Sequence, residues 1–360
     1  MIIYLANIAF IIFWAFLLLY SNPTKFKRGV FCGISAIQWI LISGLRAWDV
    51  GADTMRYANS FIRAGSLSWE TVFKSMYRVY IEGYQPIFSS EHFLYKDPGY
   101  LLFQRVCHVF THDYQVFLLI IAVILFVTMA RFIYKHSDDP CLSFLIFSTL
   151  FYTFFAITGH RQTLATALVL FVGFDFIKER KLIPFLLVST VAYLLHKSAI
   201  VFVPFYLLGA KKISWPYLGI IGAITVAVYA AGPSFILEAA EMIGYNREDV
   251  YELPPYVYVL ALSLVGVVTA VFHKRILAIS ESKKWEIAAT VFATMFGIFA
   301  LLDQSMMRVQ QYYSLFMMLS IPSLFGLFEG ESRAFIKFLF VCVMIAYLIM
   351  NNPQYSFFWQ

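Results

Sequence analysis

The 360-residue chain has few charged residues, since Asp, Glu, Lys and Arg together make up only 13% of it. A soluble domain carries about 25%, so this composition excludes an ordinary soluble enzyme. The four cysteines lie in or beside apolar runs without paired spacing, and they indicate neither a disulfide framework nor a metal site. The net charge of +6 does not indicate nucleic acid as a partner, because Lys and Arg in such a chain gather on cytoplasmic loops.

The chain is instead rich in long apolar runs. Hydrophobic residues make up 61% of the chain, and the mean hydropathy is +0.74. Runs of about 16 to 20 residues recur, and at about 1.5 Å per residue each can cross a hydrocarbon core of roughly 30 Å. We therefore predict an all-α polytopic membrane protein, with residues 1–360 in a single integral membrane domain. The clear spans are 2–20, 30–45, 115–134, 141–157, 160–177, 215–232, 255–272, 285–302, 309–328 and 335–350.

Two further segments decide which ends of the spans face outward. If residues 98–112 form a re-entrant or interfacial helix, and the run 182–209 is two short spans that turn at His196, all the basic loops fall on one side. That side is then the cytoplasm, and the chain has about twelve crossings with both termini outside. If each segment instead crosses once, basic loops fall on both sides, so we prefer the first topology. The basic loops are 25–28, 131–135, 178–181, 211–212 and 274–284.

The preferred topology puts two hydrophilic segments on the outer face. Residues 46–112 form an outer loop with interfacial or re-entrant helices, and residues 233–254 form an acidic outer loop. The first segment is rich in aromatic residues, whose flat faces are suited to stacking against sugars. These residues are Trp48, Trp69, Tyr77, Tyr80 and Tyr84.

The stretch "RAWDVGADTMRY" directly follows the second predicted span and carries four charges. Charged residues at membrane depth are costly and by default indicate a functional site. Gly51 should interrupt any helix that begins before it, so that a turn directs Asp53, Arg56 and Tyr57 toward the mouth of the bundle. The alternative is a solvated loop whose charges pair with one another.

The stretch "TGHRQTLA" opens another predicted span and places His160 and Arg161 in its first turn. The helix dipole disfavours a cation at that position unless an anion binds there. Arg161 therefore predicts a phosphate or pyrophosphate ligand, unless its side chain only extends to lipid headgroups.

Three further residues are candidates on chemical grounds. His196 interrupts an apolar run and, as a neutral imidazole, could accept a proton from a hydroxyl, although such a histidine is often structural. Asp303 and Arg308 lie at the outer junction of two predicted spans, next to interface tyrosines. No Asp-x-Asp motif or His/Cys cluster is present, so we predict no metal and no cofactor. Several guanidinium groups with one or two carboxylates and an imidazole suit an anionic, lipid-linked substrate that also has neutral, hydroxyl-rich parts.

Four motifs resemble those of the EpsG family, the Wzy-like polysaccharide polymerases. The first has the pattern R-x-x-x-V-G-x-D-T-x-x-Y, from Arg46 to Tyr57. The others are "DPGY" from Asp97, R-Q-x-x-A from Arg161 and H-x-S-A from His196. Their order and spacing cover roughly residues 30 to 210, whereas the final third of the chain is similar mainly in hydropathy.

The resemblance implies that the protein joins oligosaccharide repeat units carried on undecaprenyl pyrophosphate, at the outer leaflet of the bacterial inner or plasma membrane. Its partners would be that lipid-linked oligosaccharide and the growing lipid-linked glycan, with a chain-length regulator and a flippase as further candidates. Alternative functions are an O-antigen ligase, which has the same lipid chemistry with another acceptor, and a flippase or transporter of lipid-linked oligosaccharide.

The implied reaction is glycosyl transfer with the lipid pyrophosphate as leaving group. In this mechanism His196 or Asp53 is the general base, and Arg161 acts with Arg46 and Arg308 on the developing charge. Other candidate contacts to pyrophosphate or sugar are Arg56, Tyr57, His160 and Asp303.

Overall fold

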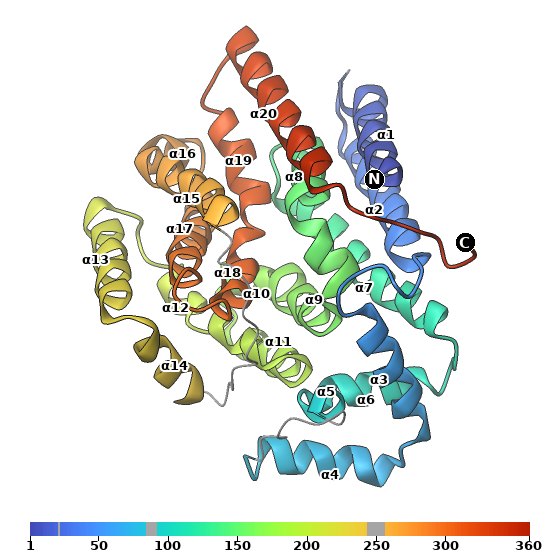
Figure 1. Cartoon of the computed structure of the whole chain (residues 1–360). Coiled ribbons are helices and arrows are strands. Elements are labelled where there is room, and N and C mark those ends of the chain that lie inside the picture. The colour runs from blue at the N-terminus through green and yellow to red at the C-terminus, as the bar shows by residue number, and fades with distance from the viewer. Residues whose placement is uncertain (21, 84–91, 243–255) are drawn as a thin grey trace.

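A computed structural model of the chain describes residues 1–20, 22–83, 92–242 and 256–360, and within these the fold is helical (Figure 1). No strand is present in the described ranges, where the one β-type pairing is an isolated bridge between Arg46 and Phe357. The residues 243–254 of the predicted acidic loop, and Tyr84, lie outside the described residues.

Within the described residues, three helices are long and apolar enough to cross a membrane: α1 (Ile2–Leu19), α7 (Tyr114–His136) and α20 (Gly330–Asn351). A fourth candidate is the pair α15 (Tyr256–Val271) and α16 (His273–Ile279), which are bent by 67° at their junction. Shorter apolar helices are α11 (Leu182–Leu195), α13 (Trp215–Ala231), and the segments Pro140–Phe151 and Lys197–Leu208. The chain is thus an all-helical protein of membrane type, while the count of about twelve crossings remains a prediction.

Several of the predicted spans are divided rather than continuous. The first divided region contains α8 (Pro140–Ile146) followed by π-helical η1 (Phe147–Phe151) and η2 (Thr153–Thr158). After Gly159 come α9 (His160–Thr166), π-helical η3 (Ala167–Val172) and α10 (Gly173–Lys178). Wide π turns within α-helices are frequently found at functional sites. Here they flank the turn that carries His160 and Arg161.

The other helices complete the bundle and the connections at its ends. They are α2 (Lys25–Gly44), 3₁₀-helical η4 (Lys197–Phe202), α12 (Phe205–Leu208), α14 (Pro233–Met242), 3₁₀-helical η5 (Glu281–Lys283), α17 (Lys284–Phe299), α18 (Met306–Ser314) and α19 (Met317–Phe325).

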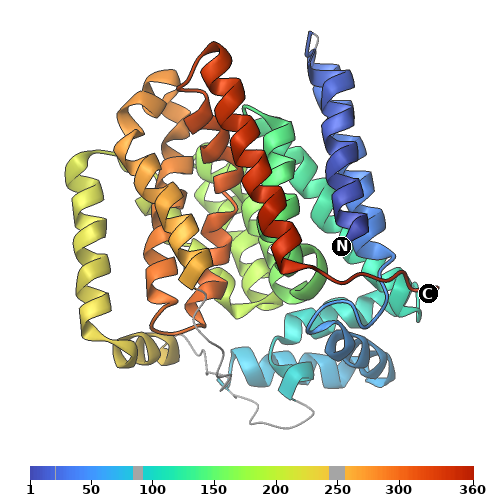
Figure 2. The ribbon, with the colours of Figure 1, turned by 45° about the horizontal axis from the view of Figure 1, so that its top comes forward.

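Four short helices form a separate layer at one end of the bundle (Figures 1 and 2). They are α3 (Thr54–Ser66), α4 (Trp69–Tyr80), α5 (His92–Tyr95) and α6 (Pro98–Cys107). The 10 residues of α6 rise about 15 Å, half the thickness of a hydrocarbon core, so this helix is too short to cross. The chain termini meet at the same end (Figure 2). There the segment after α20 hydrogen-bonds the loop after α2, through Ala47 N to Ser356 O at 2.9 Å and Phe358 N to Leu45 O at 3.1 Å.

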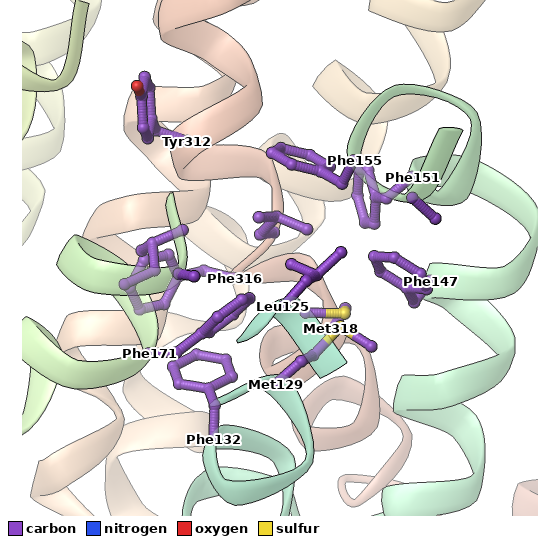
Figure 3. Close-up of a cluster of buried hydrophobic side chains, with 14 of the residues drawn as sticks. Leu125, Met129, Phe132, Phe147, Phe151, Phe155, Phe171, Tyr312, Phe316 and Met318 are labelled. Carbon is purple, nitrogen blue, oxygen red and sulfur yellow. The ribbon is translucent and has the colours of Figure 1, made fainter. Parts of the chain in front are cut away.

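The interior of the bundle is packed with aromatic side chains. Figure 3 shows one cluster, in which side chains of α7, η1, η3 and the segment after α18 meet. Nearby, the Trp39 ring of α2 stacks on Phe126 with centroids 5.6 Å apart, and its indole nitrogen donates to Ser148 Oγ at 3.0 Å. This close packing fixes the helices that carry the polar groups described below.

A charged cluster lies at the end of the bundle opposite the short-helix layer. Asp175 of α10 accepts hydrogen bonds from Arg131, from Lys135 at 2.9 Å and from His136 at 3.1 Å, all three of them residues of α7. The second nitrogen of His136 lies 3.3 Å from the Lys178 ammonium.

Candidate active site

Asp97 is the centre of a buried cluster of polar side chains, and its own side chain is only 1% exposed. It immediately precedes Pro98, the first residue of α6. Its Oδ2 accepts a hydrogen bond from Arg161 Nη1 at 3.0 Å and lies 3.1 Å from His196 Nδ1. Its Oδ1 accepts from the backbone N–H of Lys197 at 3.3 Å. Three segments far apart in sequence therefore meet at one carboxylate.

The backbone around His196 explains why this meeting is possible. Helix α11 ends at His196, where φ is −159° and ψ is 114°, and the 3₁₀ helix η4 begins at the next residue. The start of α6 packs directly against this break, because a Cβ at Gly99 would lie 2.2 Å from the Leu194 carbonyl oxygen. Tyr80 holds the contact by donating its hydroxyl to Leu194 O at 2.5 Å. Glycine at position 99 is thus required for the carboxylate to reach the histidine.

Asp97 and His196 lie in breaks between helices, outside the candidate spans. Burial favours the neutral form of Asp97, but His196 and Arg161 outweigh it and lower the pKa of this carboxyl below its usual value. For His196, burial lowers the pKa and Asp97 opposes it, while the charges of Arg161 and Arg308 add to the lowering. The pair is therefore an ionised carboxylate beside a neutral imidazole.

The hydrogen bond to Asp97 also fixes the tautomer of His196. An ionised carboxylate only accepts hydrogen bonds, so Nδ1 must carry the imidazole proton. Nε2 then has a lone pair, and it is buried with no hydrogen-bond partner among the described residues. The site thus presents an unprotonated nitrogen in a fixed orientation.

A second buried group adjoins the first through Arg161 and Tyr57. The Tyr57 ring lies 5.7 Å from the Arg161 guanidinium and stacks on the His160 ring, with centroids 4.2 Å apart. Arg46, which is only 1% exposed, directs Nη2 to His160 Nε2 at 2.8 Å and to Ile157 O at 2.9 Å. Both terminal nitrogens of Arg46 are thus directed at protein groups, whereas its Nε has no partner among the described residues.

Asp53 and Arg56 do not join these groups. They form an ion pair of 3.5 Å with each other, and their side chains are 37% and 68% exposed. Thr54 faces inward instead, with its hydroxyl donating to Val50 O at 2.7 Å. The turn at Gly51, where φ is +106°, therefore places Tyr57 in the interior and leaves the two charged residues at the surface.

The junction between α17 and α18 lies on another side of the site. Asp303 is buried and its Oδ1 accepts from the backbone N–H of Ser305 at 2.8 Å, so it stabilises the turn before α18. The Arg308 carbonyl accepts from Gln162 Nε2 at 2.7 Å, which ties α18 to α9. These contacts bring Arg308 to the same region as Arg161.

Sequence reasoning missed two residues of the site as candidates, Asp97 and Lys197. The signal for Asp97 was a carboxylate directly before Pro and Gly in an otherwise aromatic loop. Lys197 is only 9% exposed, and its ammonium forms no ion pair with a described residue. A buried ammonium is costly without a partner, so its position next to His196 should have marked it. Within the described ranges, no group of three or more His, Cys, Asp or Glu side chains is placed to hold a metal ion.

Comparison with known proteins gives one match. The family model described as the EpsG family matches residues 29–359, which is nearly the whole chain. No curated protein and no solved structure matches the chain.

Proposed function

The chain belongs to the EpsG family of Wzy-like polymerases. From this premise we propose that it joins oligosaccharide repeat units carried on undecaprenyl pyrophosphate. The reaction takes place at the outer leaflet of the bacterial inner or plasma membrane. Family membership indicates a polysaccharide polymerase-type role and a glycosyltransferase-like activity. We further propose that the donor is a lipid pyrophosphate and that the active site faces outward.

The observation that carries the mechanism is the lone pair of His196 Nε2, which the Nδ1 contact with Asp97 leaves unprotonated and without a partner among the described residues. A hydroxyl of the incoming repeat attacks the anomeric carbon of the growing glycan and gives its proton to Nε2. The bond from that carbon to the pyrophosphate oxygen breaks, and its electron pair leaves with the pyrophosphate. Asp97 stabilises the imidazolium that forms, so it acts as a positioning residue.

Positive charge around His196 favours the leaving group. The charges of Arg161 and Arg308 act on His196, and Lys197 is the next residue in the chain. Pyrophosphate gains negative charge as its bond to the sugar breaks. Fixed cations in a site that excludes water stabilise such charge strongly. We assign Arg46, His160 and Tyr57 to the wall that holds Arg161 in place, and Asp303 to the turn that presents Arg308.

Asp53 is the other base that the sequence suggests, and its exposed ion pair with Arg56 disfavours it. In the proposal Arg56 and Asp53 lie at the entrance, where they meet a substrate arriving from the membrane surface. The growing lipid-linked glycan is the second substrate, and a chain-length regulator and a flippase are the proposed protein partners.

The test of the function is reconstitution of the purified protein with lipid-linked single repeats. A polymerase converts them to longer lipid-linked glycans and releases undecaprenyl pyrophosphate. Relocation across the bilayer without a change in length would identify a flippase instead, and transfer only to a different acceptor would identify a ligase.

A further inference from the structure

A cavity of about 400 Å³ lies at the end of the bundle where the termini meet. Small-molecule pockets have volumes of about 300–1,000 Å³, so the cavity is large enough to hold a ligand. It is open to the surface and is lined by the start of α1, the loop between α2 and α3, the region of η2, and the segment 353–356 after α20. None of the residues proposed above for proton transfer lines it.

The floor of the cavity is aromatic. Tyr4 and Tyr152 are buried with ring centroids 4.7 Å apart, and Tyr355 meets Tyr4 edge-on at 5.6 Å. Tyr4 is only 2% exposed, yet its hydroxyl makes no hydrogen bond to a residue that the structure describes. This hydroxyl is therefore available to form a hydrogen bond with a polar occupant of the cavity.

The rim of the cavity is polar, and no lysine or arginine is among the described residues that line it. Asp49 accepts a long hydrogen bond from Ser356 Oγ at 3.5 Å, and Thr153 and Gln354 complete the rim. The Asp49 carboxylate disfavours a phosphate next to it, whereas it accepts hydrogen bonds well from hydroxyl groups. An aromatic floor with such a rim matches a sugar ring, which has apolar faces and hydroxyls at its edge.

One residue connects the cavity to the candidate active site. Ile157 lines the cavity, and its carbonyl accepts from Arg46 Nη2 at 2.9 Å. The same Arg46 nitrogen contacts His160, which precedes Arg161 in α9. A ligand in the cavity therefore lies against the wall of the site where transfer is proposed to occur.

We propose that this cavity is a subsite for an uncharged sugar of the glycan, remote from the sugar that reacts. The identity of the occupant as part of a lipid-linked repeat rests on the proposed function. The subsite binds free oligosaccharide without the lipid and without the reaction, and this allows a separate test.

The probe is the oligosaccharide repeat released by mild acid from the lipid-linked pool of the producing cell. Its affinity for the full-length protein in nanodiscs is measured by titration calorimetry. We expect saturable binding that Asp49→Asn and Gln354→Ala each weaken about three- to tenfold, the effect of losing one hydrogen bond. Both residues are exposed, so the variants should fold normally. Glu70→Gln on the exposed face of α4 is the matched control and should bind like the wild type.

The same variants separate this proposal from the proposed function. His196→Ala should keep its affinity for the free oligosaccharide, and Asp49→Asn should raise the KM for lipid-linked repeats while leaving kcat within about twofold. Polymerisation by a wild-type protein that does not bind the free oligosaccharide, or unchanged affinity in both rim variants, would overturn the subsite. Binding that depends on Asp49 in a protein that does not polymerise would support the subsite and refute the proposed function.

Discussion

Asp97 and Asp175 have the same kinds of partner at opposite ends of the bundle. Each accepts from an arginine and contacts a histidine ring nitrogen at 3.1 Å. They differ in the second nitrogen of the histidine. At Asp175 the other nitrogen of His136 lies 3.3 Å from Lys178, whereas Nε2 of His196 has no partner among the described residues.

The difference separates a cluster that closes on itself from one that can act on another molecule. The Asp175 cluster joins α7 to α10, and its cations are about 45% exposed, so solvent screens them. The Asp97 cluster is buried and retains an unused proton acceptor. Composition alone does not distinguish the two, because both contain Asp, Arg, Lys and His.

The largest expected effect is at the two histidines. His196→Ala should lower the polymerisation rate by about 10²- to 10⁴-fold, the usual result of losing a general base. His136→Ala should change it by less than about threefold, because His136 only links two helices. The measurement is the initial rate on purified lipid-linked repeats, normalised to folded protein. Near-normal rates for both variants would remove His196 from the chemistry.

The next effect is at the two aspartates. Asp97→Asn removes a charge-assisted hydrogen bond to His196 and should lower the rate by about 10- to 10²-fold. It should also lower thermal stability, because it leaves the buried charge of Arg161 without its anion. Asp175→Asn should leave the rate within about threefold. A positioning role for Asp97 further predicts an altered pH profile in Asp97→Asn, which a purely structural aspartate would not cause.

A smaller effect is expected at the two arginines. Arg161→Lys keeps the positive charge but loses the planar fork that bridges Asp97 and an anion, so it should reduce the rate by about tenfold. Arg131→Lys, next to Asp175, should be nearly silent because that guanidinium is partly exposed. Rates are compared at saturating substrate with folded protein as the reference. Equal tolerance at the two positions would reduce Arg161 to a structural ion pair.

The smallest effect concerns pH. The pKa of His196 is lowered from its ordinary value of 6.5, so the neutral base should persist below that pH. The rate should be constant from about pH 9 to pH 7 and should fall only as pH drops through a value below about 6.5. Measurement of kcat from pH 4.5 to 9 gives the midpoint. A midpoint above pH 7 would contradict a neutral, buried His196.

Some of the site was predictable from the chain alone. The polar residues at 196–198 interrupt an apolar run, and the structure has its break there, because a membrane-type helix excludes a polar segment of that kind. Arg161 at a helix start was conspicuous for the same reason. In both cases the signal was local, since each residue differs from the neighbours on its own helix.

The contact with Asp97 was not predictable, because it joins residues 64 and 99 positions apart and depends on the bare backbone at Gly99. Asp53 received more weight than Asp97 because it lies in the longest motif. Its exposure follows from the turn at Gly51, whose direction the sequence does not specify. The number of crossings is also unresolved by sequence, since several helices are shorter than a hydrocarbon core.

The break at His196 also determines how the length of α11 compares with the thickness of the membrane. The 14 residues of α11 rise about 21 Å, less than the roughly 30 Å hydrocarbon thickness. If α11 starts at the cytoplasmic boundary, the bilayer must thin by several ångströms for His196 to lie at its outer surface. Under the proposed function, a polyprenyl carrier would bring its phosphates to the imidazole within this thinned region of the bilayer. The hydrocarbon tail of the carrier would stay in the lipid throughout, so the reaction avoids the free-energy cost of moving a long hydrocarbon into water.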